Sequence, residues 1–143
     1  MISDVVLSNE KIIEIENGNI KHILKNDSHG FAGFGEAYFS EINYGSIKAW
    51  KKHQKMTLNL VVPYGKVHFA VYDNRTSKKT YGEYIISSVE YQRLTIPPNL
   101  WFGFKGLHKK KSIILNIANI LHNDDEVERL SINEINYDWD KIE

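Results

Sequence analysis

Several segments of the chain alternate apolar and polar residues, which is the pattern of β-strands that bury one face. These segments are rich in β-branched and aromatic residues, and turn-forming residues separate them at short intervals. They cover residues 36–42, 46–50, 56–62, 66–73, 84–88, 92–96 and 112–119. A succession of short strands of this kind predicts an all-β domain built from antiparallel sheets, such as a double-sheet jelly roll.

The clearest predicted pair of strands is residues 56–62 and 66–73, which a Pro-Tyr-Gly sequence joins. Proline and glycine favour tight turns, so we expect a β-hairpin here. Side chains of a strand alternate between its two faces, so the valines and the phenylalanine of the second strand lie on one face and His68 and Tyr72 lie on the other. We therefore expect a polar lining beside an apolar one.

Only the last part of the chain predicts a helix. Asn123 or Asp124 can cap a short helical segment over residues 125–130, and the helix dipole favours the acids in its first turn. No repeat, low-complexity tract or linker interrupts the sequence. Residues 1–143 are therefore expected to form a single domain.

Composition narrows the classes of function. The chain of 143 residues carries 18 basic and 18 acidic side chains, so it lacks the excess positive charge of most nucleic-acid binders. It contains no cysteine, which excludes disulfides, thiolate metal sites and a thiol nucleophile. No apolar run approaches the ~20 residues of a membrane span, and acids interrupt residues 1–16, unlike a signal peptide. We expect a cytoplasmic protein that binds neither nucleic acid nor membranes.

Several short motifs follow one another in an order that matches a known family. They are residues 45–51 (Gly-Ser-Ile-Lys-Ala-Trp-Lys), 65–67 (Gly-Lys-Val), 73–75 (Asp-Asn-Arg), 80–82 (Thr-Tyr-Gly), 90–98 (Glu-Tyr-Gln-Arg-Leu-Thr-Ile-Pro-Pro), 103–104 (Gly-Phe) and 128–129 (Glu-Arg). This order, over roughly residues 33–139, resembles the dTDP-4-dehydrorhamnose 3,5-epimerase family of RmlC-like cupins. Residues 33–40, 56–63 and 115–119 are similar to a short-chain branch of that family found among surface-polysaccharide genes.

The resemblance implies a cupin barrel that acts on a nucleotide-linked 4-keto sugar, by epimerisation at C3, C5 or both. Epimerisation beside a ketone requires a base, a second proton carrier and a donor that stabilises the enolate oxygen. The family supplies an Arg-Gly-Leu-His segment, a tyrosine on a later strand and an aspartate that orients the histidine. At the matching positions this chain has Lys48 for the arginine, Lys51 for the histidine and, near the tyrosine, Asn116. The aspartate belongs to a C-terminal extension without a counterpart before Glu143.

These replacements leave two functions open. If the protein is an enzyme, the resemblance implies an isomerase in which Lys51 and His53 transfer protons. A lysine can act as a base only where burial or a neighbouring cation lowers its pKa. The residues expected to contact the substrate, at its phosphates or its sugar, are Lys48, Asn59, His68, Tyr72, Arg75 and Asn116. The alternative is a non-catalytic sugar-nucleotide-binding or regulatory cupin.

Most of these residues also have a structural interpretation. His53 follows a run of lysines and could be a solvated strand end. His68 and Tyr72 could instead make hydrogen bonds within the core. Arg75 could pair with Asp73 and hold a loop. The asparagines inside apolar strands need a ligand or a polar network, because an unpartnered buried amide costs ~1–3 kcal/mol.

We expect no metal and no other cofactor, because the cupin ligand pattern is incomplete. Its histidine pair corresponds to Lys51 and His53, and the second motif, residues 97–102, has no histidine. One imidazole is too few ligands for a metal ion. The resemblance also implies a homodimer, and residues 11–15 have enough β propensity to pair with a sheet edge of the partner.

Overall fold

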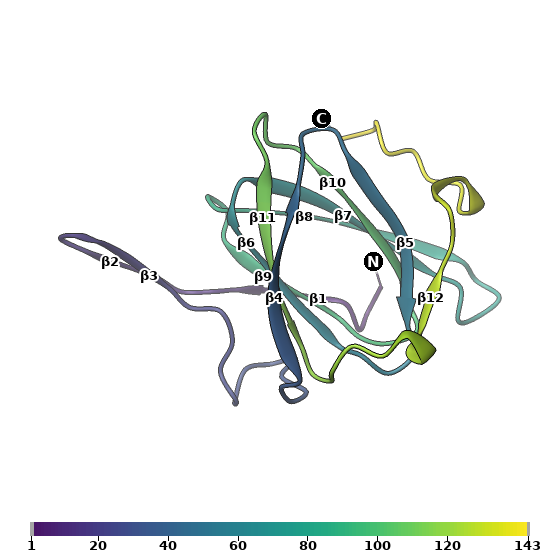
Figure 1. Cartoon of the computed structure of the whole chain (residues 1–143), viewed down its shortest axis with the longest axis horizontal. Helices are drawn as coiled ribbons and strands as arrows, with labels where there is room; N and C mark the ends of the chain where they lie inside the picture. The colour runs from purple at the N-terminus through teal and green to yellow at the C-terminus, as the bar shows by residue number, and fades with distance from the viewer. Residues whose placement is uncertain (1, 143) are drawn as a thin grey trace.

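Two five-stranded antiparallel sheets pack face to face and enclose a barrel, as Figure 1 shows for the computed structural model, which describes residues 2–142. The first sheet has the order β1 (Val6–Asn9), β9 (Gln92–Ile96), β6 (Leu58–Tyr64), β11 (Ser112–Ala118) and β4 (Glu36–Ile42). The second has the order β12 (Val127–Arg129), β5 (Ile47–His53), β10 (Trp101–Gly106), β7 (Lys66–Asp73) and β8 (Thr80–Ser87). A separate hairpin consists of β2 (Ile12–Ile15) and β3 (Gly18–Lys21). This architecture confirms the predicted all-β jelly roll.

The side chains that face inward from the two sheets meet in one apolar core. Leu60 and Ile114 of the first sheet pack with Phe69 and Val71 of the second, and all of them are buried. Burial of this kind stabilises the fold by about 1.5–3 kcal/mol per large side chain. The structure has the alternation predicted for β7, because His68 belongs to the opposite, outer face of its sheet.

The short helix expected over residues 125–130 does not form. The Asn123 side chain does act as a cap and accepts a hydrogen bond from the Asp125 backbone at 3.0 Å. Only one 3-10 turn follows, η1 (Asp124–Glu126), and the chain then enters β12, which pairs with β5. The sheet therefore satisfies the backbone groups that a helix would have paired internally. Across residues 2–142 no helix is long and apolar enough to cross a membrane.

After β12 the C-terminal tail runs over the outer face of the second sheet, and the turn η2 (Ile132–Glu134) lies within it (Figure 1). Ile135 and Trp139 of the tail pack on Trp50 and Trp101 of the sheet in a second apolar cluster. The Lys105 ammonium donates to the Trp139 carbonyl oxygen at 3.1 Å. The second sheet is therefore covered on one side by the barrel core and on the other by the tail.

The β2–β3 hairpin projects from the barrel as an arm (Figure 1). Two of its isoleucines are open to solvent, with Ile15 52% and Ile20 51% exposed, and Ile12 and Ile13 are half-buried. The base of the arm is fixed by buried Arg93, whose Nε donates to the Glu10 carboxylate at 2.8 Å. The arm thus leaves the barrel from a rigid anchor while its own apolar side chains stay uncovered.

Candidate functional site

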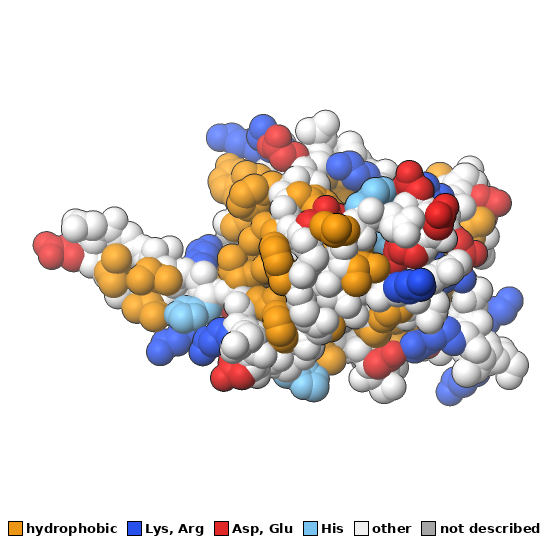
Figure 2. Space-filling model, turned by 60° about the horizontal axis from the view of Figure 1, so that its bottom comes forward, with side chains coloured by type: hydrophobic (Ala, Val, Ile, Leu, Met, Phe, Trp, Pro, Cys, Tyr) orange, Lys and Arg blue, Asp and Glu red, His pale blue; other side chains and the backbone are white. Residues whose placement is uncertain are grey.

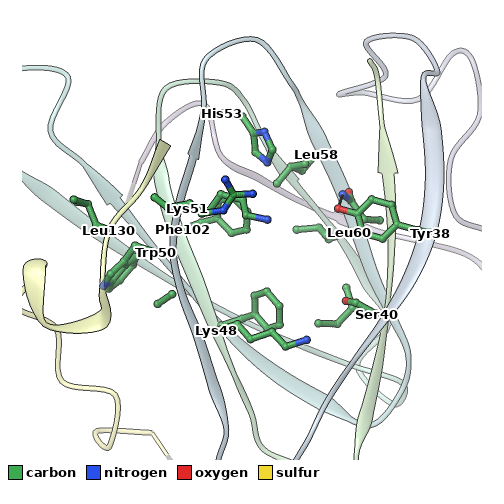
Figure 3. A pocket seen from close by; sticks show the side chains of 15 residues that line it. Tyr38, Ser40, Lys48, Trp50, Lys51, His53, Leu58, Leu60, Phe102 and Leu130 are labelled. Carbon is green, nitrogen blue, oxygen red and sulfur yellow. Dashed lines mark hydrogen bonds between the residues drawn. The ribbon is translucent and has the colours of Figure 1, made fainter. Parts of the chain in front are cut away.

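A cavity of about 400 Å³ lies between the two sheets, and Figure 3 shows the side chains that line it. The strands β4, β6 and β11 contribute one wall, and β5, β10 and β12 contribute the other. Its apolar lining consists of Leu58, Leu60, Phe102, Phe104, Ile114 and Leu130 together with Ala49 and Trp50. Its polar side chains are those of Tyr38, Ser40, Lys48, Lys51, His53, Asn116 and Arg129. A mostly apolar hollow with a few convergent polar groups is typical of a small-molecule site.

The strand β5 brings Lys48, Lys51 and His53 to this cavity together. Regular alternation would place Lys48 and Lys51 on opposite faces of the strand. The pairing with β10 shifts, however: Phe102 pairs with Lys51 and Gly103 pairs with Ala49, so that Trp50 is left without a counterpart. Such a bulge re-aims the side chains on either side of it. The extra residue therefore puts both lysines and the histidine on the cavity side.

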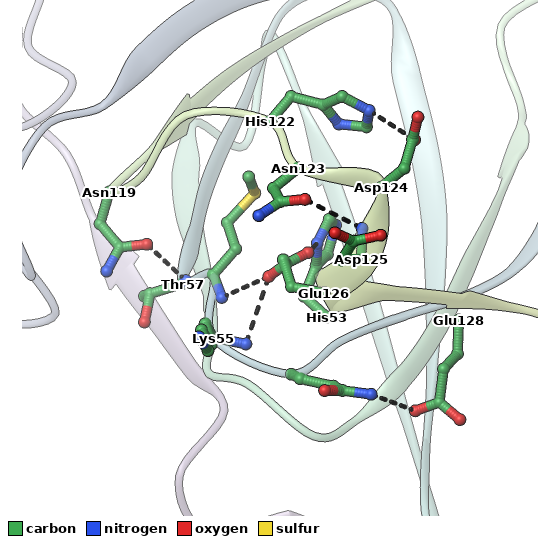
Figure 4. A network of polar contacts seen from close by, with 12 residues as sticks. His53, Lys55, Thr57, Asn119, His122, Asn123, Asp124, Asp125, Glu126 and Glu128 are labelled. Carbon is green, nitrogen blue, oxygen red and sulfur yellow. Dashed lines mark hydrogen bonds and ion pairs between the residues drawn. The ribbon is translucent and has the colours of Figure 1, made fainter.

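His53 is held by a buried carboxylate, as Figure 4 shows. Its Nδ1 lies 2.6 Å from Glu126 Oε2, and Glu126 Oε1 accepts hydrogen bonds from the backbone of Lys55 at 3.2 Å and Met56 at 2.9 Å. Glu126 is only 3% exposed. A carboxylate beside Nδ1 selects the tautomer with its proton on Nδ1, which leaves Nε2 as an acceptor available to the cavity.

The environment keeps the imidazole neutral and the carboxylate charged. Burial lowers the pKa of His53 below its usual value, although the hydrogen bond that the ring donates to Glu126 works in the opposite direction. Burial alone would raise the pKa of Glu126, but the hydrogen bonds from His53 and Met56 lower it overall. A neutral imidazole backed by an ionised carboxylate is ready to accept a proton.

Lys51 lies half-buried in the cavity wall next to Arg129 of β12, its partner in the sheet register. Burial lowers the pKa of Lys51 most, and the positive charges of Arg129 and Lys48 lower it further. Within residues 2–142 its ammonium has no hydrogen-bond or ion-pair acceptor. These conditions favour the neutral amine more than at an exposed lysine.

Tyr38 and Asn116 face each other across the paired strands β4 and β11. The Asn116 side-chain nitrogen donates to the Tyr38 hydroxyl at 3.0 Å, so the phenol retains its own proton for another acceptor. Asn116 is buried, and its Oδ1 has no partner among the described residues. The pair thus offers a ligand one hydroxyl donor and one amide acceptor.

Positive charge dominates the cavity. The Lys48 ammonium donates to the Glu41 carbonyl oxygen at 2.8 Å, which holds it near the loop that joins β4 to β5. An ammonium has further donors to offer, and Lys51 and Arg129 add two more cationic groups to the lining. The site is therefore suited to an anionic ligand. Across residues 2–142, no three His, Asp or Glu side chains gather closely enough to hold a metal ion.

The remaining residues expected to contact the sugar lie away from this cavity. The Asn59 side chain points to the outer face of the first sheet, where its Oδ1 accepts from Arg93 and from Thr95 and its Nδ2 donates to the Gly30 carbonyl at 3.1 Å. These partners show that the Asn59 side chain lies on the side of its strand that faces away from the cavity, where the polar network satisfies its amide. This position differs from the sugar-facing one expected from sequence.

His68 and Tyr72 also differ from the expected orientation. They share the outer face of β7, which the C-terminal tail covers, and His68 Nε2 lies 2.8 Å from the Tyr137 hydroxyl. Alternation sends the apolar side chains of β7 into the barrel, so its polar ones must point outward. The face that carries polar residues is the one beneath the tail.

Arg75 lies in an exposed turn after β7, outside the cavity lining. Its guanidinium binds the Asp4 carboxylate with two hydrogen bonds of 2.7 and 2.9 Å, and it also donates to Asp73. Both carboxylates occupy the donors that a phosphate would need. This geometry corresponds to the loop-holding interpretation.

Sequence reasoning missed the cavity residues Tyr38 and Arg129, and it missed Glu126, which holds His53 from behind. Glu126 is 73 positions from His53, and Tyr38 is 78 positions from Asn116. No local pattern links positions so far apart. One signal for Tyr38 was usable. The family pattern has a tyrosine near position 116, and in this chain the neighbouring strand β4 provides a tyrosine, Tyr38, opposite Asn116.

Comparisons with known proteins show which proteins this chain is similar to. The crystal structure of a dTDP sugar isomerase from Desulfovibrio desulfuricans is 32% identical, with a TM-score of 0.91 over 98% of this chain and 93% of that one. A probable low-salt glycan biosynthesis epimerase of Haloferax volcanii is 26% identical over 136 residues, or 90% of this chain and 87% of the relative. The spore coat polysaccharide biosynthesis protein SpsL of Bacillus subtilis is 25% identical over 131 residues, or 87% of each chain. The chain matches no protein-family model.

Proposed function

The chain belongs to the RmlC-like cupin family of dTDP-sugar isomerases and epimerases, and from that membership we propose that it is an isomerase of a nucleotide-linked 4-keto sugar in polysaccharide biosynthesis. The reaction is epimerisation at C3, C5 or both. The observation that carries the proposal is the His53–Glu126 pair at the edge of a cationic cavity. A histidine oriented in this way has the charge state and the tautomer that a general base requires.

His53 removes the proton on the carbon next to the ketone through Nε2, and the Glu126 carboxylate stabilises the imidazolium that forms. Epimerisation also requires a proton to return from the opposite side of that carbon. Tyr38 and Lys51 are two further cavity groups that can exchange a proton, and Tyr38 belongs to the other sheet. Protons can therefore reach the sugar from both walls.

The diphosphate lies at the cationic groups Lys48 and Arg129, since within residues 2–142 neither is paired with a carboxylate. Asn116 Oδ1 accepts a hydrogen bond from a sugar hydroxyl, because a buried unpartnered acceptor gains most from a donor on the ligand. Phe102 and Leu60 form the apolar surface for the sugar ring.

A second candidate is a sugar-nucleotide-binding cupin without turnover. One observation favours it: a lysine, Lys51, stands where the family has its histidine. Such a protein would keep the cationic cavity and bind the same ligands. It would not move the carbon-bound proton.

Solvent deuterium exchange separates the two candidates. The protein is incubated in D₂O with dTDP-4-keto-6-deoxyglucose, and loss of the C3 and C5 proton signals is followed by NMR. We expect exchange at one or both carbons. Thermal stabilisation of the protein by this compound without any exchange would favour the binding protein and contradict the isomerase.

We propose further that a second copy of the chain covers the outer face of β4 and β11. Phe39 is 68% exposed on this face of the edge strand β4, and its pairing partner Leu115 lies beside it on β11, the next strand of the sheet. Figure 2 shows apolar side chains gathered next to the arm. A two-stranded hairpin is marginal in water by itself, so an arm with open isoleucines needs a surface to pack on.

Light scattering tests the homodimer. We expect a particle of twice the chain mass at micromolar concentration, and Phe39→Asp should shift it toward the monomer. Val89→Asp is the matched control, because Val89 is 88% exposed in a bend after β8, away from β4. A monomeric wild-type protein would contradict the proposal.

A further inference from the structure

Lys51 combines three features that a lysine at an ordinary surface position lacks. It lines the cavity, it stands beside the cations Arg129 and Lys48, and within residues 2–142 no acceptor holds its ammonium. Its neighbour Lys52 has the opposite character, since it points out of the cavity and pairs with Glu128 at 3.0 Å. The two adjacent lysines therefore differ in environment but not in chemical type.

We propose that Lys51 forms a Schiff base with the ketone carbon of the bound sugar. This inference rests on the proposed function, since it requires a 4-keto sugar in the cavity. A lysine amine that has lost its proton is a nucleophile toward carbonyl carbons, and desolvation or a neighbouring cation is what makes the neutral form available. Both conditions are met at Lys51, where burial and the two cations lower its pKa.

The step balances without an external oxidant or reductant. The neutral amine attacks the ketone carbon, the carbonyl oxygen takes up a proton, and the carbinolamine loses one water molecule. The product is an iminium in which nitrogen replaces oxygen at C4. Removal of the neighbouring C–H proton by His53 then gives a neutral enamine, reprotonation restores the iminium, and one water molecule hydrolyses it to the ketone and the free amine.

The geometry of β5 suits this division of tasks. Lys51 and His53 are two residues apart on the same face, which places their backbones about 6.6 Å apart at 3.3 Å per residue. A carbonyl carbon bonded to Lys51 therefore brings the adjacent carbon toward His53. Lys51 is then occupied covalently, and Tyr38 of the facing sheet remains as the second proton carrier.

An iminium also explains how the site can work without the arginine and histidine of the family pattern. It carries the positive charge on the substrate itself, next to the C–H bond that breaks. The enolate oxygen that would need a strong donor never forms. The cavity has a hydroxyl and an amide on its other wall, at Tyr38 and Asn116, and neither is a cation.

Reductive trapping tests the proposal on the full chain. The protein is mixed with dTDP-4-keto-6-deoxyglucose and sodium cyanoborohydride, which reduces iminium ions in preference to ketones. Intact mass spectrometry and peptide mapping then locate the adduct. We expect it on Lys51 in the wild type and in the control Lys52→Arg, and we expect its loss in Lys51→Arg, with circular dichroism confirming that each variant is folded.

Deuterium exchange measured on the same samples separates this inference from the proposed function. Exchange with an adduct on Lys51 supports both. Exchange with no adduct, or with an adduct only on other lysines, overturns the Schiff base and leaves the isomerase intact. An adduct without exchange supports the covalent step and contradicts the isomerase, and the absence of both overturns both.

Discussion

Replacing Glu126 with glutamine tests whether His53 is a base held in one tautomer. Glutamine has nearly the shape of glutamate, but its side-chain nitrogen can only donate hydrogen bonds. If its oxygen stays on the backbone donors of Lys55 and Met56, its nitrogen must face His53 Nδ1. Nδ1 then has to accept, and the ring proton moves to Nε2. The imidazole can no longer take a proton from the cavity side.

The contacts of Glu126 set the magnitudes. A positioned general base contributes about 10²–10⁴-fold, so deuterium exchange should slow by about that factor. The stability of the fold should change less, because the backbone donors of Lys55 and Met56 keep an oxygen acceptor, although that oxygen no longer carries a negative charge. We expect a decrease of about 1–3 kcal/mol in the free energy of unfolding. NMR of the sugar nucleotide in D₂O measures the exchange, and urea denaturation followed by circular dichroism measures the stability.

Glu128→Gln is the control for Glu126→Gln. Glu128 lies two residues further along, and its partners are the half-buried Lys52 and the exposed Gln54. Its replacement should leave exchange unchanged. The reasoning would be refuted if Glu126→Gln exchanged at the wild-type rate, or if Glu128→Gln slowed exchange as strongly.

Three further predictions follow from the cavity and the tail. Lys48→Ala should weaken binding of a dTDP-sugar by ~1–3 kcal/mol in calorimetry through a lost charge-assisted contact, and unchanged affinity would remove Lys48 from the phosphate site. Tyr38→Phe should slow deuterium exchange by about 10²-fold or more while circular dichroism stays that of the wild type, because only the hydroxyl is lost and the ring is kept. Wild-type exchange in this variant would contradict the role of Tyr38 as a proton carrier. Burial, with Lys141 and Lys105 nearby, lowers the pKa of His68 from 6.5 to about 4, so between these values the unfolded chain binds a proton that the folded one does not. Stability should therefore fall as the pH drops through this window, by up to about 1.4 kcal/mol per pH unit, and His68→Phe should reduce the slope of urea stability against pH by that amount; an unchanged slope would show that His68 does not titrate in this way.

The alternation of side chains predicted much of the sheet structure. The strands β4, β7 and β9 begin and end at the predicted residues. β10 escaped prediction because its Trp-Phe-Gly-Phe run is apolar without alternation and begins only three residues after a proline pair. The segment after Asn123 was assigned to a helix, since its acids suit a helix start, and the pairing with β5 that makes it a strand is a long-range contact.

The candidate site was predictable only in part, for a related reason. The resemblance identified Lys48, Lys51 and His53, which strict alternation would not have put on one face because the bulge at Trp50 is invisible in the sequence. In the family pattern an aspartate orients the histidine, and the resemblance assigned no residue of this chain to that role. Glu126 provides a carboxylate for His53 from within the barrel instead.

The aromatic cluster beneath the C-terminal tail provides an intrinsic spectroscopic probe of the tail and of β5. All the tryptophans of the chain, Trp50, Trp101 and Trp139, belong to it, and the rings of Trp50 and Trp139 lie 5.3 Å apart. Tryptophan emission, and the tryptophan part of the near-ultraviolet dichroism, therefore both arise from this one layer. Trp50 sits directly before Lys51 in the strand that borders the cavity, with its indole nitrogen bonded to the tail at the Ile132 carbonyl. Any ligand that displaces β5 or loosens the tail should thus change the wavelength and the intensity of the intrinsic tryptophan fluorescence, so no added label is needed.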